Sequence, residues 1–319
     1  MTEPETPVSE IEPAKPGDAP EESWLQKAPG AAQPYLTLSR FDRPVGFWLL
    51  ALPCWIGLAF ARFTGGLQLI DLFWVPLFGL GAIAMRGAGC TWNDIADRDL
   101  DAKVARTAGR PLPSGQITSP QAYAWLAAQL FVGFLVWLAL PLDAKIVALL
   151  AIPLVAAYPF MKRVTWWPQA WLGATFNWGV LVAYFTAGGE TLPGIILALI
   201  LLTGLALWTI AYDTIYALQD VEDDALAGVK STARLFGDEA VLAAFCFHLT
   251  AAALIALAGW VGGGGPIVAL TAIVFLAHGL YQSVRLKSSK NVAALDVFRS
   301  NVWAGAILAG GFALAAMFS

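Results

Sequence analysis

Apolar segments of membrane-spanning length follow one another from about residue 45 to the end of the chain. Only 13% of the 319 residues are charged and 58% are hydrophobic, whereas about a quarter of a soluble domain is charged. Segments of about 20 apolar residues cross a bilayer as helices, which satisfy their own backbone hydrogen bonds. We therefore predict an all-α polytopic membrane protein with about nine spans, at residues 45–63, 70–92, 119–140, 143–161, 168–187, 193–217, 240–261, 266–284 and 299–318.

The first 35 residues have a different composition. They carry seven acids, two lysines and four prolines before residue 20, which predicts disorder because little apolar surface can be buried. They lack the apolar core of a signal peptide and the Arg-rich, acid-poor composition of a transit peptide. We predict a disordered acidic tail at 1–35 and a transmembrane domain at 36–319, and favour a bacterial inner membrane over a mitochondrion.

Positive charge is unevenly divided between the predicted connections. With nine spans and the N-terminus inside, the outer connections hold only Arg62 and Lys145, while the inner ones hold fourteen cations. Cytoplasmic loops are enriched in lysine and arginine, so the inner side is predicted to be cytoplasmic. Three cysteines lie far apart in apolar sequence without a paired spacing, which predicts neither a zinc site nor a redox pair.

Two groups of oxygen-bearing side chains follow the second and sixth predicted spans. In the first, Asn93, Asp94, Asp97 and Asp101 fall within an arc of about 100° on a helix. In the second, Asp213, Asp220 and Asp224 would share one helical stripe. Like charges spaced in this way repel, but oxygen ligands on one face suit Mg²⁺. The two groups predict a Mg²⁺–diphosphate site at the cytoplasmic membrane surface.

Cations lie near both acidic groups. Arg106 and Arg110 lie on a proline-rich loop and suit bidentate recognition of a phosphate or carboxylate. Alternatively, they only reflect the enrichment of positive charge in inner loops. Arg86 lies inside a predicted span, where a charge is costly and indicates function or an internal salt bridge, for example to Asp213. Lys162 ends the fourth span, where it could bind substrate or reach the lipid head groups.

Four motifs in order resemble the UbiA superfamily of intramembrane prenyltransferases. They are N-D-x-x-D-x-x-x-D from Asn93, R-T-x-x-R-P-L-P-S-G from Arg106, Y-P-F-M-K-R from Tyr158 and D-T-x-Y-A-x-x-D-x-x-D-D from Asp213. The likeness runs from about Arg43 to the C-terminus. Glu222 departs from it, since an aspartate is expected there, but the carboxylate is retained.

The resemblance implies nine helices around a central cavity that is capped by the two acidic loops. It implies Mg²⁺ and diphosphate binding by Asn93, Asp97, Asp101, Asp220 and Asp224, and we add Asp94 as a metal ligand. The expected catalytic residues are Asp97, Asp101, Asp220, Asp224 and Asp213, the last as a candidate proton acceptor. The expected substrate-binding residues are Arg43, Arg86, Arg106, Arg110, Tyr158, Lys162 and Lys230.

Within the superfamily, the motifs most resemble enzymes that transfer a polyprenyl group to 4-hydroxybenzoate in ubiquinone biosynthesis. The implied partners are polyprenyl diphosphate, 4-hydroxybenzoate and membrane lipid, with no nucleic acid. A haem O synthase-type or chlorophyll synthase-type prenyltransferase is an alternative. A cation transporter is another, but transporters hold their charges near the bilayer midplane, whereas these charges lie at one membrane face.

Overall fold

A computed structural model describes residues 24–103, 105–226, 228–288 and 290–319, and all regular secondary structure in these residues is helical. The elements are η1 (Trp24–Lys27), α1 (Gln33–Leu38), α2 (Val45–Ala61), α3 (Asp71–Asp101), α4 (Ala105–Ala108), α5 (Ser119–Ala139), α6 (Leu142–Leu150), α7 (Ile152–Val164), α8 (Pro168–Asn177), α9 (Gly179–Thr186), α10 (Leu192–Ala217), α11 (Val221–Leu226), α12 (Thr232–Phe236), η2 (Gly237–Glu239), α13 (Ala240–Gly259), η3 (Trp260–Gly264), α14 (Gly265–Ser288) and α15 (Lys290–Met317).

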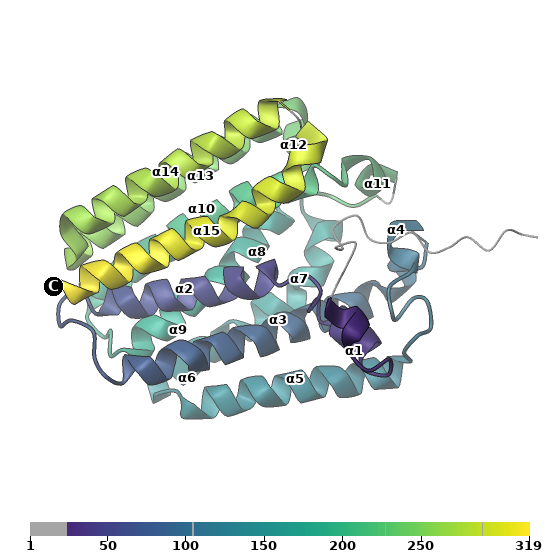
Figure 1. Cartoon of the computed structure of the whole chain (residues 1–319), viewed down its shortest axis with the longest axis horizontal. Coiled ribbons are helices and arrows are strands. Elements are labelled where there is room, and N and C mark those ends of the chain that lie inside the picture. The colour runs from purple at the N-terminus through teal and green to yellow at the C-terminus, as the bar shows by residue number, and fades with distance from the viewer. Residues whose placement is uncertain (1–23, 104, 227, 289) are drawn as a thin grey trace, which may run out of the picture.

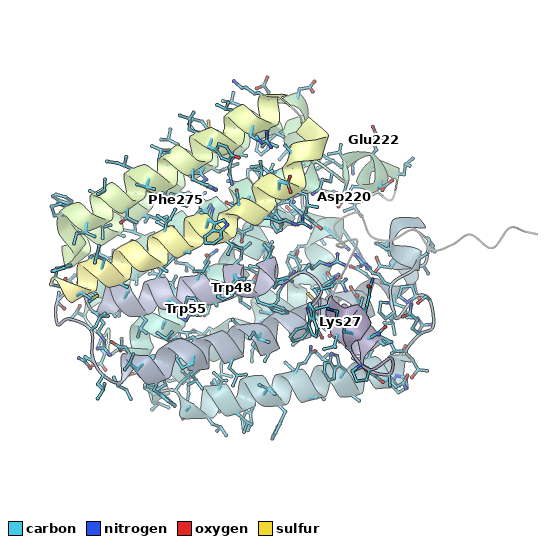
Figure 2. All side chains as sticks on the ribbon, in the orientation of Figure 1. Lys27, Trp48, Trp55, Asp220, Glu222 and Phe275 are labelled. Atoms are coloured by element: carbon cyan, nitrogen blue, oxygen red, sulfur yellow. The ribbon has the colours of Figure 1, made fainter. Side chains whose placement is uncertain are left out.

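The long helices form one bundle, and the short helices α1, α4, α11 and α12 lie at one of its ends (Figure 1). We call the end that carries α1, α4, α11 and α12 the loop end; the C-terminus lies at the opposite end. Side chains follow the same division in Figure 2, where Asp220 and Glu222 lie at the loop end and Trp55 and Phe275 lie along the helices. Both predicted acidic groups are therefore brought to one end of the bundle.

Local signals explain where several helices begin. Thr118 and Gln121 form a reciprocal capping box at the start of α5, and Thr191 accepts a hydrogen bond from the Gly194 amide at the start of α10. Such caps satisfy amides that have no partner within the helix. Pro168 begins α8, where the amide that proline lacks is not needed.

The main core lies where α2, α9, α10, α13 and α15 meet. Ile56, Leu205, Ile255 and Leu308 are fully buried there. The outer surface is also apolar: Phe131, Phe134 and Leu138 of α5 are exposed. Buried and exposed faces that are both apolar are expected of helices that contact lipid on the outside.

Six stretches of the described chain are long and apolar enough to cross a membrane. They are Asp71–Asp101, Ser119–Ala139, Leu142–Val164, Leu192–Ala217, Thr232–Lys287 and Ala293–Met317. The fifth, of 56 residues, contains both α13 and α14, which the glycine-rich η3 joins with Gly263 at φ 107°. The 17-residue α2 is apolar but shorter. The predicted count of about nine spans is therefore not confirmed.

The predicted acidic tail overlaps structured chain. Residues 1–23 lie outside the described residues, but η1 and the start of α1 fall before residue 35. Tyr35 and Leu38 pack with Leu112 and Trp125, and the Trp24 indole donates a hydrogen bond to the Phe41 carbonyl. These contacts place the start of packed structure earlier than the composition indicated.

We expect cysteine labelling to separate the two ends of the bundle. In a variant without the three native cysteines, Lys103→Cys and Lys287→Cys at the loop end should react with an impermeant maleimide from the cytoplasmic side, because the inner connections carry the positive charge. The exposed Leu69→Cys before α3 should react from the other side. Labelling of all three positions from one side would contradict this orientation.

Candidate active site

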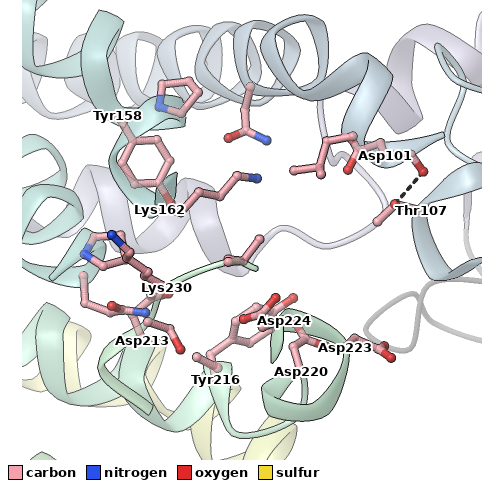
Figure 3. Close-up of a pocket in the computed structure, with 18 of the residues that line it drawn as sticks. Asp101, Thr107, Tyr158, Lys162, Asp213, Tyr216, Asp220, Asp223, Asp224 and Lys230 are labelled. Atoms are coloured by element: carbon pink, nitrogen blue, oxygen red, sulfur yellow. Dashed lines mark hydrogen bonds between the residues drawn. The ribbon is translucent and has the colours of Figure 1, made fainter. Parts of the chain in front are cut away.

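A cavity of about 260 Å³ lies at the loop end, between the two acidic groups. Figure 3 shows Tyr158, Lys162 and Asp101 on one side, and Asp213, Asp220 and Asp224 on the other. The polar and charged residues that line it are Asn93, Asp101, Thr107, Arg110, Tyr158, Lys162, Gln169, Asp213, Tyr216, Asp220, Asp223, Asp224, Lys230 and Ser231. Five carboxylates and three cationic side chains thus share one cavity.

The second acidic group does not lie on one helix, so the predicted single stripe is wrong. Helix α10 ends at Ala217, and a turn carries Asp220 before α11 begins at Val221. The Asp220 amide bonds to the Ala217 carbonyl at 3.2 Å, while the Asp220 carbonyl accepts from the Asp224 amide at 2.8 Å. A break relieves the crowding of like charges along one helix. Asp213, Asp220 and Asp224 nevertheless line the same cavity.

The first acidic group is carried by the continuous helix α3, as predicted, and its carboxylates are paired with cations. Asp97 is fully buried; Lys162 donates to it, and Arg163 Nη2 lies 2.8 Å from its Oδ1. Asp101 Oδ2 lies 2.6 Å from Arg110 Nη1. Asn93, Asp101, Arg110 and Lys162 line the cavity, whereas Asp97 lies behind Lys162.

Asp94 is not among the residues that line the cavity. Its carboxylate is fully buried and accepts two hydrogen bonds from Arg40 Nη2, at 2.8 and 3.0 Å. Burial is the largest influence and lowers the pKa of the Arg40 guanidinium, but the charge and hydrogen bond of Asp94, together with the charges of Cys90 and Asp42, outweigh it, and the net shift is upward. Both of its oxygens are occupied by Arg40, so the role of Asp94 as a metal ligand stays a prediction.

The segment that carries Lys230, just before α12, is joined to the end of α7. The Lys230 amide donates to the Lys162 carbonyl at 2.9 Å, and Lys230 Nζ donates to the Val164 carbonyl at 3.1 Å. The Thr232 amide donates to Gln169 Oε1 at 3.0 Å. Positions that are far apart in the sequence thus form one wall.

The remaining predicted substrate residues have different surroundings. Arg86 Nε is buried and has no hydrogen-bond partner within the described chain, while its guanidinium lies over the Phe176 ring, 5.4 Å from the centroid. It packs on Gly46 rather than lining the cavity. Arg43 pairs with Asp42 at 2.8 Å and is also not among the lining residues. Arg106 lies in α4, and its side chain is outside the described residues.

The donor set of the cavity fits a hard cation. Its carboxylates and the Asn93 amide are oxygen ligands, as Mg²⁺ prefers. Among the described residues, no three His, Cys, Asp or Glu side chains already converge as a metal site. Mg²⁺ commonly binds one or two carboxylates and completes its shell with water and substrate phosphates, so a complete protein cage is not required.

The chain matches the UbiA prenyltransferase family over residues 50–316. The chain belongs to this family. It is 40% identical to the mitochondrial 4-hydroxybenzoate polyprenyltransferase of Bos taurus over 91% of this chain and 77% of that protein. It is 38% identical to 4-hydroxybenzoate geranyltransferase 2 of Lithospermum erythrorhizon over 93% of this chain and 95% of that protein.

Solved structures show that this UbiA family member has the family fold. A UbiA homologue from Aeropyrum pernix superposes with a TM-score of 0.71 at 24% identity, covering 83% of this chain and 96% of that one. A UbiA homologue from Archaeoglobus fulgidus bound to GPP and Mg²⁺ superposes with a TM-score of 0.67 at 19% identity, covering 90% and 100%. Together with the six apolar stretches, the family makes this a multi-pass membrane protein.

The family assignment favours an enzyme over the cation transporter considered above. The sequence interpretation missed three residues that bear on the site. Arg40 contacts Asp94, and Arg163 contacts Asp97. Asp223 lines the cavity. Arg40 and Arg163 looked like ordinary inner-loop cations. Their partners lie 54 and 66 residues away in the chain, and no local pattern indicates such pairs.

Proposed function

We propose that this UbiA family member transfers a polyprenyl group from polyprenyl diphosphate to the ring carbon ortho to the hydroxyl of 4-hydroxybenzoate, in ubiquinone biosynthesis. The observation that carries the proposal is the single cavity in which both acidic groups meet Arg110, Lys162 and Lys230. The choice of acceptor is supported by relatives named as 4-hydroxybenzoate prenyltransferases, at about 40% identity.

The charges of the cavity account for a metal requirement. Its five carboxylates outnumber its three cations, so a diphosphate alone would be repelled from one wall. We propose that Asn93, Asp97, Asp101, Asp220 and Asp224 hold Mg²⁺ together with the diphosphate. Asp97 would reach the metal by exchanging its lysine and arginine partners. Bound Mg²⁺ would neutralise the diphosphate and stabilise it as a leaving group.

The cationic residues act on the same leaving group. Arg110, Lys162 and Lys230 place positive charge where negative charge develops as the allylic carbon–oxygen bond breaks. The electron-rich ring then attacks, and Asp213 on the cavity wall is the proposed acceptor of the ring proton.

The carboxylate of 4-hydroxybenzoate needs a cation that lies deeper in the protein than the diphosphate site. Arg86 has a buried donor atom without a partner in the described chain and lies on α3, seven residues before Asn93. An unsatisfied buried guanidinium nitrogen is costly, and a benzoate carboxylate would satisfy it. We therefore propose Arg86 as the residue that binds the acid group of 4-hydroxybenzoate.

The proposal is tested with membranes that contain the protein, labelled 4-hydroxybenzoate and geranyl diphosphate. We expect a ring-prenylated product that is lost when EDTA removes divalent metal and restored when Mg²⁺ is added in excess. Product formation that is unaffected by EDTA would contradict the metal site, and prenylation of a different aromatic acceptor would overturn the choice of substrate.

Arg86→Lys should separate the two substrates. Lysine keeps the charge but loses the planar pair of donors that matches a carboxylate. We expect the KM for 4-hydroxybenzoate to rise about tenfold, with a change of less than about twofold for the prenyl diphosphate. Steady-state kinetics in which each substrate is varied would measure both values. Equal effects on both would move Arg86 to the diphosphate site or to a structural role.

The names of the relatives bear on which membrane contains the protein. Relatives from Bos taurus and Mus musculus are named as mitochondrial enzymes, so they give the predicted bacterial inner membrane no support. We propose only that the cavity opens on the side of the membrane where the positively charged connections lie.

A further inference from the structure

Arg40 has an unusual backbone conformation. Its φ of 60° makes it the single non-glycine residue with positive φ in the described part of the chain. This region is strained for a residue with a Cβ and persists where surrounding contacts hold it. Arg40 lies between α1 and α2, so the strain is located where the chain crosses the loop end of the bundle.

The Arg40 guanidinium holds two elements together. Its Nη1 donates to the carbonyls of Thr37 and Leu38, at 3.1 and 3.3 Å, which closes the C-terminal end of α1. Its Nη2 donates to both oxygens of Asp94 on α3. One side chain thus satisfies helix carbonyls and neutralises a fully buried carboxylate.

The segment that carries Arg40 is fixed on the bundle by buried polar contacts. Ser39 Oγ accepts hydrogen bonds from Trp125 Nε1 and Gln129 Nε2, both at 2.7 Å. Gln129 Oε1 in turn accepts from Thr91 Oγ1 at 3.0 Å. Figure 1 shows α1 at the loop end, beside the ends of α3 and α5. Arg40 is therefore presented to Asp94 from a rigid base.

Arg110 links this pair to the cavity. Its Nη1 lies 3.4 Å from Asp94 Oδ1 and 2.6 Å from Asp101 Oδ2, and both Arg110 and Asp101 line the cavity. Because Arg40 neutralises Asp94, Arg110 stays on Asp101. Without Arg40, the buried Asp94 would draw Arg110 inward, since an uncompensated buried charge is strongly unfavourable.

We propose that Arg40 is a positioning residue for the diphosphate end of the cavity: it neutralises Asp94 and so keeps Arg110 paired with Asp101 at the wall. This inference rests on the proposed function, because the cavity must bind a prenyl diphosphate for the position of Arg110 to matter. It assigns Asp94 to the support of the site rather than to the metal.

The test removes the Arg40 side chain and leaves its backbone conformation in place. Glycine adopts positive φ without strain, so Arg40→Gly isolates the guanidinium. We expect the KM for geranyl diphosphate to rise at least about tenfold and the KM for 4-hydroxybenzoate to change by less than about twofold. Adding Asp94→Asn should bring the KM for the diphosphate back toward the wild-type value, because the buried charge is then absent.

A matched control is the buried ion pair at the other end of α3. Arg62 and Asp71 lie 2.8 Å apart with both side chains buried. Arg62→Leu should lower the melting temperature and leave both KM values unchanged. If Arg40→Gly does not accumulate, Arg40→Lys carries the test, with an expected rise of about threefold, since lysine keeps the charge and loses the two-point contact.

Equal changes in both KM values, or no rescue by Asp94→Asn, would overturn the role of Arg40. Wild-type turnover with an unchanged KM for the diphosphate in Arg40→Gly would overturn it as well, while the proposed function would stand. A wild-type protein that transfers no prenyl group would instead overturn the proposed function, and this inference with it.

Discussion

Asp220→Ala should lower prenyl transfer by more than about 100-fold, with the protein still inserted in the membrane. Asp220 lies on the cavity wall opposite Asp101 and Lys162 (Figure 3). If both acidic groups hold one metal–diphosphate complex, removing a carboxylate from either group weakens the binding of the metal. The diphosphate leaving group then loses the positive charge that compensates its own. Losing a single group that stabilises transition-state charge typically costs ~10²–10³ in rate. Initial rates, normalised to the amount of folded protein, would measure the loss.

Glu222 provides the matched control for Asp220. It lies two residues along the chain in α11, and it is exposed and not among the residues that line the cavity. Glu222→Ala removes a carboxylate from the same loop, so it should keep most of the wild-type rate. Retention of more than about a tenth of the rate in Asp220→Ala would count against a site built from two acidic groups.

Gly57→Leu should abolish accumulation of the folded protein. Gly57 of α2 faces Val180 of α9, and a Cβ at position 57 would overlap the Val180 backbone. Close helix contacts in membranes depend on small residues, because no hydrophobic force drives one apolar helix against another in lipid. Backbone cannot move aside as a flexible side chain can, so α2 and α9 would have to separate. Fluorescence size-exclusion chromatography of the tagged protein would measure the loss of the monodisperse peak.

The control for Gly57 is another glycine in a helix. Gly310 of α15 is exposed, and a Cβ added there would meet nothing within 4 Å. Gly310→Ala should give a normal peak, and the better helix propensity of alanine could raise thermal stability slightly. A normal peak for Gly57→Leu would show that α2 and α9 are not packed as described.

The helix that carries the first acidic group was predictable because it depends on local periodicity, although only Asn93 and Asp101 of that group line the cavity. Helix α3 runs without a break from Asp71 to Asp101, so spacing alone places Asn93, Asp97 and Asp101 on neighbouring faces. The second group was not predictable in the same way. No glycine or proline marks the end of α10, and the break before Asp220 is made by turn hydrogen bonds. The stripe was wrong, although its members do line one cavity.

Sequence patterns could not predict which cation pairs with each carboxylate. Charge bias between loops predicted which cations share a membrane face, but it does not say which carboxylate each one meets. Lys162 and Arg163 contact Asp97, and Arg40 contacts Asp94, because α7 and the end of α1 pack beside α3. Such pairs are set by tertiary packing, so they require the structure.

The most direct test of the two-group site is calorimetric binding of an unreactive thiolo analogue of geranyl diphosphate to the purified protein. We predict that binding requires Mg²⁺ and is weakened at least about 100-fold by Asp101→Ala and by Asp220→Ala alike, because each removes a carboxylate from one of the two facing walls. Binding of equal strength without Mg²⁺, or a loss in only one of the two variants, would contradict a metal–diphosphate site shared by both acidic groups.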